Sequence, residues 1–282
     1  MSLKTTRNLF FIIVSFMLLS FTGDKSITCR EIVEKMIKKI NDVERLKYSL
    51  KIVERTKGKF NNFGSSVKLN RKPRKLYLTT QGIEVLWVEG KNNGKALVNP
   101  NSFPFINLNL DPMGSLMRDD QHHTINEMGF DYFGNIIAYN LRQSGASFDK
   151  YFKYEGDEIL NGKSCHKITI DNPDFKFISY TVKKGEDLVK IARNYRVAEF
   201  MILENNPKLD DYNDVKEGSV IRIPNMYARN VIIYVDKTYY LPVGVRVFDH
   251  KGLFEQYDYF SLQVNPSFDD AEFTKSYKDY KF

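Results

Sequence analysis

The sequence predicts an α+β fold, in which helices cover an antiparallel sheet and a small β-α-α-β segment interrupts the strands. Asn-Gly turns at 93–94 and 161–162 stand between runs of alternating apolar residues, as in β-hairpins. Apolar residues recur at helical spacing in two other places, after Arg30 and after Thr124. Aromatic residues, mostly Tyr and Phe, make up 14% of the chain, and this composition also favours strands.

The first 23 residues have the pattern of a secretory signal peptide. A basic start with Lys4 and Arg7 precedes an apolar run from Leu9 to Phe21, and small residues follow. This run of 13 residues is short for a membrane anchor, which needs about 20. We therefore expect an exported protein of the periplasm or cell envelope, with residues 1–23 removed.

Composition and charge narrow the class of protein. Hydrophobic residues make up 42% of the chain, which is enough for a substantial core and excludes disorder outside the termini. The formal net charge is +7, and it becomes +5 once Lys4 and Arg7 are lost. This excess suits an anionic surface, but no basic helix or nucleic-acid motif accompanies it. We expect no nucleic-acid partner.

Two cysteines, Cys29 and Cys165, remain in the expected mature chain. In an oxidising compartment such a pair can form a disulfide, which here would join the N-terminus to a strand far along the chain. Two free buried thiols are the alternative. A charged residue separates Cys29 from the small residues of the signal, so we do not expect lipidation there.

The strand pattern begins after an amphipathic helix expected from Arg30 to Arg45, and alternation starts at Leu46. A second helix is expected after Thr124, which forms a capping-box pattern with Glu127. Further strands are expected at SSVKLN, RKLYLTT, IEVLWVE, GKALVN, YFKYEGDEIL, KSCHKITI, NVIIYVD, YLPVGVRVFD and LFEQYDYFSLQV.

Residues 180–224 interrupt the strands. YTVKKGEDL reads as a strand and a turn, with Gly185 at the break and acidic residues where a helix starts. VKIARNYRV continues that helix, and AEFMILENNP forms a second helix that ends before Pro207. VKEGSVIRIP returns as a strand. This pattern resembles a LysM module over all 45 residues.

The resemblance implies binding of N-acetylglucosamine-containing glycans, such as peptidoglycan or chitin. In this family the sugar lies in a shallow groove between the first turn and the loop after the second helix. Amides at Asn205 and Asn206 would bond the N-acetyl group, and Leu188 would seat its methyl. A degenerate module kept for packing alone is the alternative. The implied groove residues are Gly185, Glu186, Asp187, Leu188, Asn205, Asn206, Pro207 and Leu209.

The rest of the chain resembles lipoprotein-carrier (LolA/LolB-like) half-barrels with a helical lid, on the pattern from Asp236 to Pro266. That pattern is Asp, Leu-Pro, Asp-x-x-Gly, then an aromatic strand ending in Asn-Pro. The resemblance implies an apolar cavity that holds acyl chains, and a core without a ligand is the alternative. The implied cavity residues are Phe105, Leu108, Phe130, Phe133, Ile136 and Ile137. The expected division is a signal peptide (1–23), the first part of the carrier-like domain (24–178), a LysM domain (179–226) and the last strands of the carrier-like domain (227–282).

We expect no catalytic constellation, cofactor or metal. RDDQHH, at 118–123, gathers two aspartates and two histidines, but a polar run before a helix cap is typical of a solvated loop. Cys165 and His166 are neighbours on a strand, so their side chains point to opposite faces and cannot act as nucleophile and base.

These observations together predict a non-enzymatic envelope protein that binds peptidoglycan or a related N-acetylglucosamine polymer through its LysM module. The half-barrel would hold a lipid or a lipoprotein segment. Two alternatives stay open. One is a peptidoglycan-modifying hydrolase that the module targets to its substrate, and the other is a module that serves only as a structural insertion.

Overall fold

The computed structural model describes residues 27–103 and 105–282. The expected signal peptide lies outside the described residues. The helices are α1 (Cys29–Asp42), α2 (Ser115–Arg118), α3 (Asp131–Ser144), α4 (Phe148–Tyr151), α5 (Leu188–Tyr195) and α6 (Glu199–Glu204). The strands of the large sheet are β1 (Arg45–Thr56), β2 (Lys59–Arg71), β3 (Arg74–Thr80), β4 (Ile83–Val88), β5 (Ala96–Asn99), β6 (Leu108–Leu110), β7 (Phe152–Leu160), β8 (Lys163–Asp171), β11 (Asn230–Asp236), β12 (Pro242–Asp249) and β13 (Gly252–Val264). The small sheet pairs β9 (Phe177–Thr181) with β10 (Val220–Pro224).

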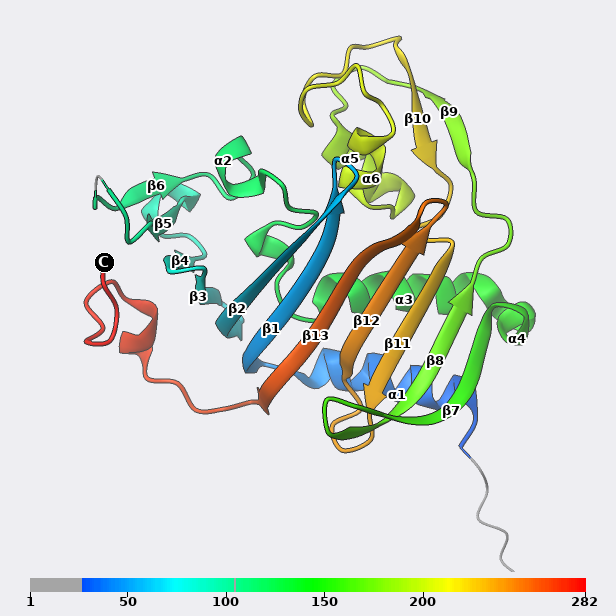
Figure 1. The fold of residues 1–282 in the computed structure, drawn as a ribbon, viewed down its shortest axis with the longest axis horizontal. Coiled ribbons are helices and arrows are strands. Elements are labelled where there is room, and N and C mark those ends of the chain that lie inside the picture. Colours follow the sequence, from blue (N-terminus) through cyan, green and yellow to red (C-terminus); the bar gives the residue numbers. More distant parts are fainter. Residues whose placement is uncertain (1–26, 104) are drawn as a thin grey trace, which may run out of the picture.

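The eleven strands of the large sheet lie in the order β6-β5-β4-β3-β2-β1-β13-β12-β11-β8-β7, and the pairs are antiparallel. Strands β1 and β13, from opposite ends of the chain, are neighbours near the middle. Helices α1 and α3 lie together across one face of this sheet, and the main core fills the space between (Figure 1). The predicted antiparallel sheet with helices on it is confirmed.

Helix α1 begins at a capping box. The Thr28 hydroxyl oxygen accepts from the Glu31 backbone N–H at 3.2 Å, and the Thr28 N–H donates to the Glu31 carboxylate at 2.8 Å. The buried face of the helix meets α3 closely at Gly134, where an added Cβ would lie 2.9 Å from Ile40 Cγ2. Only glycine allows the two helices to approach this far.

The second helix begins later than the sequence predicts. A short 3₁₀ turn covers Ile125–Glu127, and α3 starts only at Asp131. Half of the predicted capping box is present, because the Thr124 N–H donates to the Glu127 carboxylate at 3.0 Å. Gly129 then takes a φ of +97°, which no helix can accommodate, so the first turn is separated from α3.

The β-α-α-β segment is inserted between two strands that are neighbours in the sheet, β8 and β11. The connections are tied together where they leave the sheet: Asn172 N–H donates to Arg229 O at 2.8 Å. A little further on, Lys176 N–H donates to the Asn225 side-chain oxygen at 2.8 Å. The segment has its own core, formed by Tyr180, Val182, Leu188, Ile191, Ala192, Val197, Ile202, Ile221 and Ile223. The predicted insertion is therefore confirmed.

Helix α6 nevertheless joins the inserted segment to the main core. Phe200 and Met201 pack into the core of the large sheet, and the Phe200 ring stacks on His122 with ring centres 4.4 Å apart. Polar pairs flank this contact. Glu199 pairs with Arg118, and Glu204 lies 3.4 Å from Arg55. Apolar and charged contacts thus hold the insertion. It lies at one end of the sheet (Figure 1).

The possible disulfide is not formed, and Cys29 and Cys165 are both free thiols in the structure. Cys165 lies opposite Glu158 in the β7–β8 pair, near the hairpin turn. The thiol of Cys29 instead feels the charges of Asp149 and Glu155, towards the other end of β7. Burial is the main cause that raises the pKa of Cys29 to about 12 and that of Cys165 to about 11, so both thiols stay protonated near neutral pH.

Candidate functional site

The two sides of the predicted glycan groove lie next to each other in the inserted segment. Leu188, at the end of the first turn, donates its backbone N–H to Tyr212 O at 2.9 Å, in the loop after α6. The loop is shaped by a further turn in which Leu209 N–H donates to Asn206 O at 2.9 Å. The fold therefore brings together the segments that the sequence assigns to the groove.

Several of the predicted groove side chains are occupied by the fold itself. The Leu188 side chain is fully buried in the module core, so it offers no surface to an acetyl methyl, and that part of the prediction is wrong. The Asn206 amide joins α6 to β10: its NH₂ donates to Ile202 O and Arg222 O, both at 2.7 Å, and its oxygen accepts from Arg222 N–H at 2.9 Å. Asn206 thus holds the far side of the groove in place.

The acidic turn is also internally bonded. Tyr180 donates its hydroxyl to the Glu186 carboxylate at 2.8 Å, and the Asp187 carboxylate caps α5 by accepting from Lys190 N–H at 2.7 Å. The Asn205 NH₂ donates to Met201 O at 2.8 Å. Among the predicted residues, Gly185 and Pro207 are exposed and Leu209 is half-buried. Their role as glycan contacts stays a prediction.

An apolar cavity of about 70 Å³ lies between the large sheet and the segment that precedes and begins α3. Phe130 and Phe133 line it, as predicted. The other four predicted residues do not. Ile136 and Ile137 pack in the main core, Leu108 lies on the edge strand β6, and Phe105 is 72% exposed on the loop before it. The apolar wall is completed by sheet residues, among them Leu50, Ile52, Phe63, Pro242, Val245 and Tyr259.

The cavity is small for a lipid. An engineered protein cavity of about 150 Å³ accepts a single benzene molecule, and the volume here is about half of that. A whole acyl chain therefore exceeds the space that this cavity offers.

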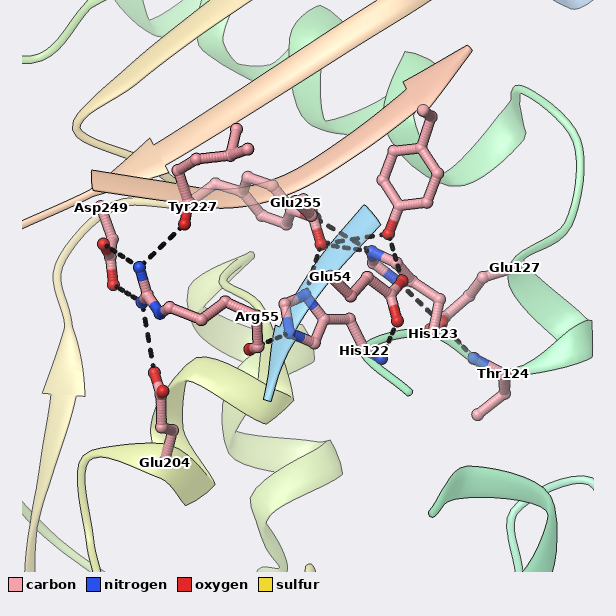
Figure 2. A network of polar contacts seen from close by, with 12 residues as sticks. Glu54, Arg55, His122, His123, Thr124, Glu127, Glu204, Tyr227, Asp249 and Glu255 are labelled. Atoms are coloured by element: carbon pink, nitrogen blue, oxygen red, sulfur yellow. Dashed lines mark hydrogen bonds and ion pairs between the residues drawn. The ribbon is translucent and has the colours of Figure 1, made fainter. Parts of the chain in front are cut away.

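One end of the cavity is polar, and Figure 2 shows how its residues converge. Glu54 on β1 and Glu255 on β13 lie directly opposite each other in the sheet. Their side chains meet His122, from the loop before the 3₁₀ turn: His122 Nδ1 lies 2.9 Å from Glu255 Oε2, and the His122 backbone N–H donates to Glu54 Oε2 at 3.0 Å. His123 Nε2 reaches the same Glu255 oxygen at 3.1 Å.

The loop with RDDQHH is therefore not solvated along its whole length. His122 is only 2% exposed, and its ring is stacked between Phe200 and Phe254, with centres 4.4 and 4.0 Å away. Asp119 and Asp120 remain on the surface, near Lys57. The sequence-based expectation is wrong for His122 because the sheet and α6 together supply partners that no local pattern reveals.

Two carboxylates raise the pKa of His123, and the histidines lower the pKa values of these carboxylates. Burial opposes a charge on the His123 ring, but Glu255 and Glu127 outweigh it and hold the pKa of His123 well above 6.5. Burial likewise acts to raise the pKa of Glu255, yet the two histidines hold that pKa far below its ordinary value. Tyr227 donates to Glu255 and Tyr257 donates to Glu54, and both tyrosines have raised pKa values through burial and the nearby negative charges.

A second set of charges lies beside this cluster, on the side of α6 (Figure 2). The Arg55 guanidinium makes two bonds to the Asp249 carboxylate, at 2.5 and 3.1 Å, and one to Leu253 O at 2.9 Å. It also reaches Glu204 of α6 at 3.4 Å. Arg55 therefore joins the sheet to the inserted segment.

We expect the stability of the protein to depend on pH through Glu199. Burial raises the pKa of Glu199 to about 7, against the opposing effect of Arg118. Because this pKa lies above the ordinary value of 4.5, the free energy of unfolding should fall as the pH rises from about 4.5 to about 7, and should not depend on Glu199 outside this window. At about 1.4 kcal/mol per pKa unit, the loss is at most about 3–4 kcal/mol. Urea unfolding at several pH values measures it, and a Glu199→Gln variant that keeps the full slope would contradict the assignment.

One member of this cluster, Glu54, could have been identified from the periodicity of the sequence. Tyr48, Leu50 and Ile52 alternate along β1 on the buried face, and Glu54 continues that alternation. A carboxylate at a buried strand position needs a partner. Nothing local identifies that partner, because Glu255 lies about two hundred residues further along the chain.

The fold defines the class of protein: a large antiparallel sheet into which a β-α-α-β module of the LysM type is inserted. Residues 43–184 match the family described as "Protein of unknown function (DUF1571)", and residues 180–224 match the LysM domain. The first match spans half of the chain, so the protein belongs to the DUF1571 family. It carries a LysM domain at the predicted residues. Among curated proteins, none matches this chain.

Solved structures with a similar arrangement include MucB, at 8% identity and a TM-score of 0.40 over 86% of this chain and 62% of MucB, so the chain spans less than two thirds of that protein. The lipoprotein LppX of Mycobacterium tuberculosis matches at 11% identity and a TM-score of 0.43, over 86% of this chain and 97% of LppX. A LolA superfamily protein of Nitrosomonas europaea matches at 10% identity and a TM-score of 0.34, over 89% of this chain and 100% of that protein. These low scores assign no ligand.

Across the described ranges, 27–103 and 105–282, each helix is too short or too polar to cross a membrane.

Proposed function

We propose that this protein is a non-enzymatic component of the bacterial cell envelope that binds peptidoglycan, or a related N-acetylglucosamine polymer, through its LysM domain. The observation that carries the proposal is the complete LysM domain at 180–224, with its own core and with its first turn and far loop in hydrogen-bond contact. The signal-peptide pattern supports the location. One domain touches little of a glycan and binds weakly, but a polymer offers many equivalent sites.

Pelleting with purified sacculi tests the proposal. The mature protein should sediment with the sacculi, and a Leu209→Glu variant should stay in the supernatant because it places a charge at the edge of the groove. Val220→Glu is the matched control, since it makes the same type of change at an exposed position on β10. Folded wild-type protein that remains in the supernatant would contradict glycan binding and leave the LysM domain a structural insertion.

A zymogram against peptidoglycan separates this proposal from the alternative of a targeted hydrolase. We expect no clearing by the mature protein at concentrations where a known wall hydrolase clears the gel. A cleared zone at the position of the protein band would establish an enzyme instead.

We further propose that the half-barrel takes an apolar group, such as the end of an acyl chain or an apolar side chain of a lipoprotein segment. The support is the apolar wall of the cavity beneath Phe130 and Phe133. A fluorescent fatty acid should bind to the wild type, and Val245→Phe, which fills the cavity from the sheet side, should abolish the binding. Ile159→Phe, at an exposed site on β7, is the control. Equal binding by both variants would contradict a ligand in this cavity.

A further inference from the structure

Three buried side chains direct possible metal-ligand atoms towards one point at the polar end of the cavity. They are Glu54, His122 and Glu255, and their ligand atoms all lie within 4.8 Å of one another. Glu54 and Glu255 are opposite each other on neighbouring strands and are 2% and 1% exposed. Like charges at such positions destabilise a sheet, and buried carboxylates require a positive partner.

The orientation of the His122 ring is the one that a metal-binding histidine needs. Its Nε2 lies 2.9 Å from Arg55 O, a carbonyl that can only accept, so Nε2 carries a hydrogen and donates it. Nδ1 is thereby directed to Glu255, and the stacking of Phe200 and Phe254 on the ring prevents it from turning away. Histidines that bind metals typically hold their second ring nitrogen through such a bond to a carbonyl or a carboxylate.

His123 shows the same arrangement from the cavity side. Its Nε2 lies 3.1 Å from Glu255 Oε2, and its Nδ1 lies 3.2 Å from the Glu127 carboxylate. That carboxylate is itself fixed by the Thr124 N–H at 3.0 Å. A carboxylate that holds one histidine nitrogen while the other faces the site is a recurrent arrangement around bound zinc.

Tyrosines orient the two carboxylates as well. Tyr227 donates to Glu255 Oε1 at 2.8 Å, and Tyr257 donates to Glu54 Oε1 at 2.6 Å. Each candidate ligand therefore has a partner that fixes its direction, which is the property that separates a metal site from a chance group of polar residues.

The positive side chains nearby do not replace a metal ion. Arg55 is engaged by Asp249 and Glu204, and Arg118 is engaged by Glu199. Arg193 acts on Glu127 only through longer-range attraction. Within the cluster itself, three carboxylates face two imidazoles, so negative charge remains even when both rings are protonated.

We propose that Glu54, His122 and Glu255 bind one divalent transition-metal ion, with His123 as the nearest fourth donor. One or two imidazole nitrogens with carboxylate oxygens suit Zn²⁺ and its first-row neighbours, whereas Mg²⁺ and Ca²⁺ prefer oxygen ligands alone. A nitrogen that binds a metal ion carries no hydrogen, so any proton held at His122 Nδ1 leaves to solvent when the ion binds. The ion would connect β1, β13 and the loop before α3, and so fix one wall of the cavity. The site does not depend on glycan binding.

Metal titration of the untagged mature chain tests this proposal. After dialysis against a chelator, Co²⁺ should give a visible absorption band that saturates at one equivalent, and Zn²⁺ should displace it. Zn²⁺ should also raise the melting temperature, because an ion that binds only the folded state stabilises it. The absence of a saturable band, or saturation at several equivalents with no thermal shift, would overturn the proposal.

Variants locate the ion. Glu54→Gln should lower the affinity for Co²⁺ at least as much as the loss of an orienting partner does, which is about 10- to 100-fold. Tyr227→Phe removes one hydroxyl from the surroundings of Glu255, so it provides a second variant if Glu54→Gln fails to fold, and it should weaken binding about 10-fold. His166→Asn is the control, because this buried histidine pairs with Asp157 outside the cluster. Weakening by His166→Asn alone would assign the ion elsewhere and overturn the proposal.

Discussion

Replacement of Arg55 by methionine is expected to lower the free energy of unfolding by about 3–5 kcal/mol. The substitution keeps the apolar stem but leaves the Asp249 carboxylate, which is fully buried, without its two charged bonds. Glu204 of the LysM domain loses its buried partner at the same time. An uncompensated buried charge costs far more than a surface ion pair contributes, so the effect should be visible as a lower urea midpoint.

Lys57→Met is the matched control for this experiment. Lys57 lies two residues further along and also pairs with acidic side chains, Asp119 and Asp120, but it is 76% exposed. Such pairs contribute between zero and about 1 kcal/mol. Equal losses for the two variants would mean that the Arg55 network is hydrated in solution, against the buried arrangement described above.

Truncation of Phe200 to alanine is expected to cost about 3–5 kcal/mol, although the residue lies in the LysM domain. Its side chain packs into the core of the large sheet and stacks on His122, so its removal leaves a cavity between the two parts of the molecule. The measurement is the free energy of unfolding from urea denaturation, together with hydrogen exchange of the α6 amides. In the wild type, the α6 amides should lose protection from exchange together with the amides of the large sheet.

Val220→Ala serves as the control for Phe200→Ala, since Val220 is an exposed apolar residue of the same domain. It should change stability by less than about 0.5 kcal/mol. A Phe200→Ala variant with wild-type stability of the large sheet would show that the LysM domain folds and unfolds as a separate unit.

Local patterns were sufficient for most of the architecture. The Asn-Gly turns, the alternation in β1 and the turn at Gly185 are short-range features, and they predicted the hairpins and the inserted module. The start of α3 was misplaced because Thr124 and Glu127 do form a capping interaction, but around a single turn. Gly129 ends that turn through its positive φ, and its position in the sequence does not reveal this conformation.

The sites were harder to predict because they depend on pairs that are distant in sequence. Asn206 has the polarity of a glycan ligand, yet its amide is used to join α6 to β10. His122 and Glu255 meet only because β13 pairs with β1 and because α6 covers the loop that carries His122. Six apolar residues were assigned to a cavity because the chain resembles lipoprotein carriers, and packing placed only Phe130 and Phe133 at the cavity wall.

The attachment of the LysM domain also determines how the molecule would transmit a mechanical load. Both of its connections leave the same end of the sheet, from the adjacent strands β8 and β11. A pull on a glycan-bound domain would therefore draw these two strands in the same direction, with no sliding of one past the other. The shear would fall on their outer neighbours, β7 and β12, where it is shared by many backbone hydrogen bonds that must yield together. Such a geometry resists tension along the strands.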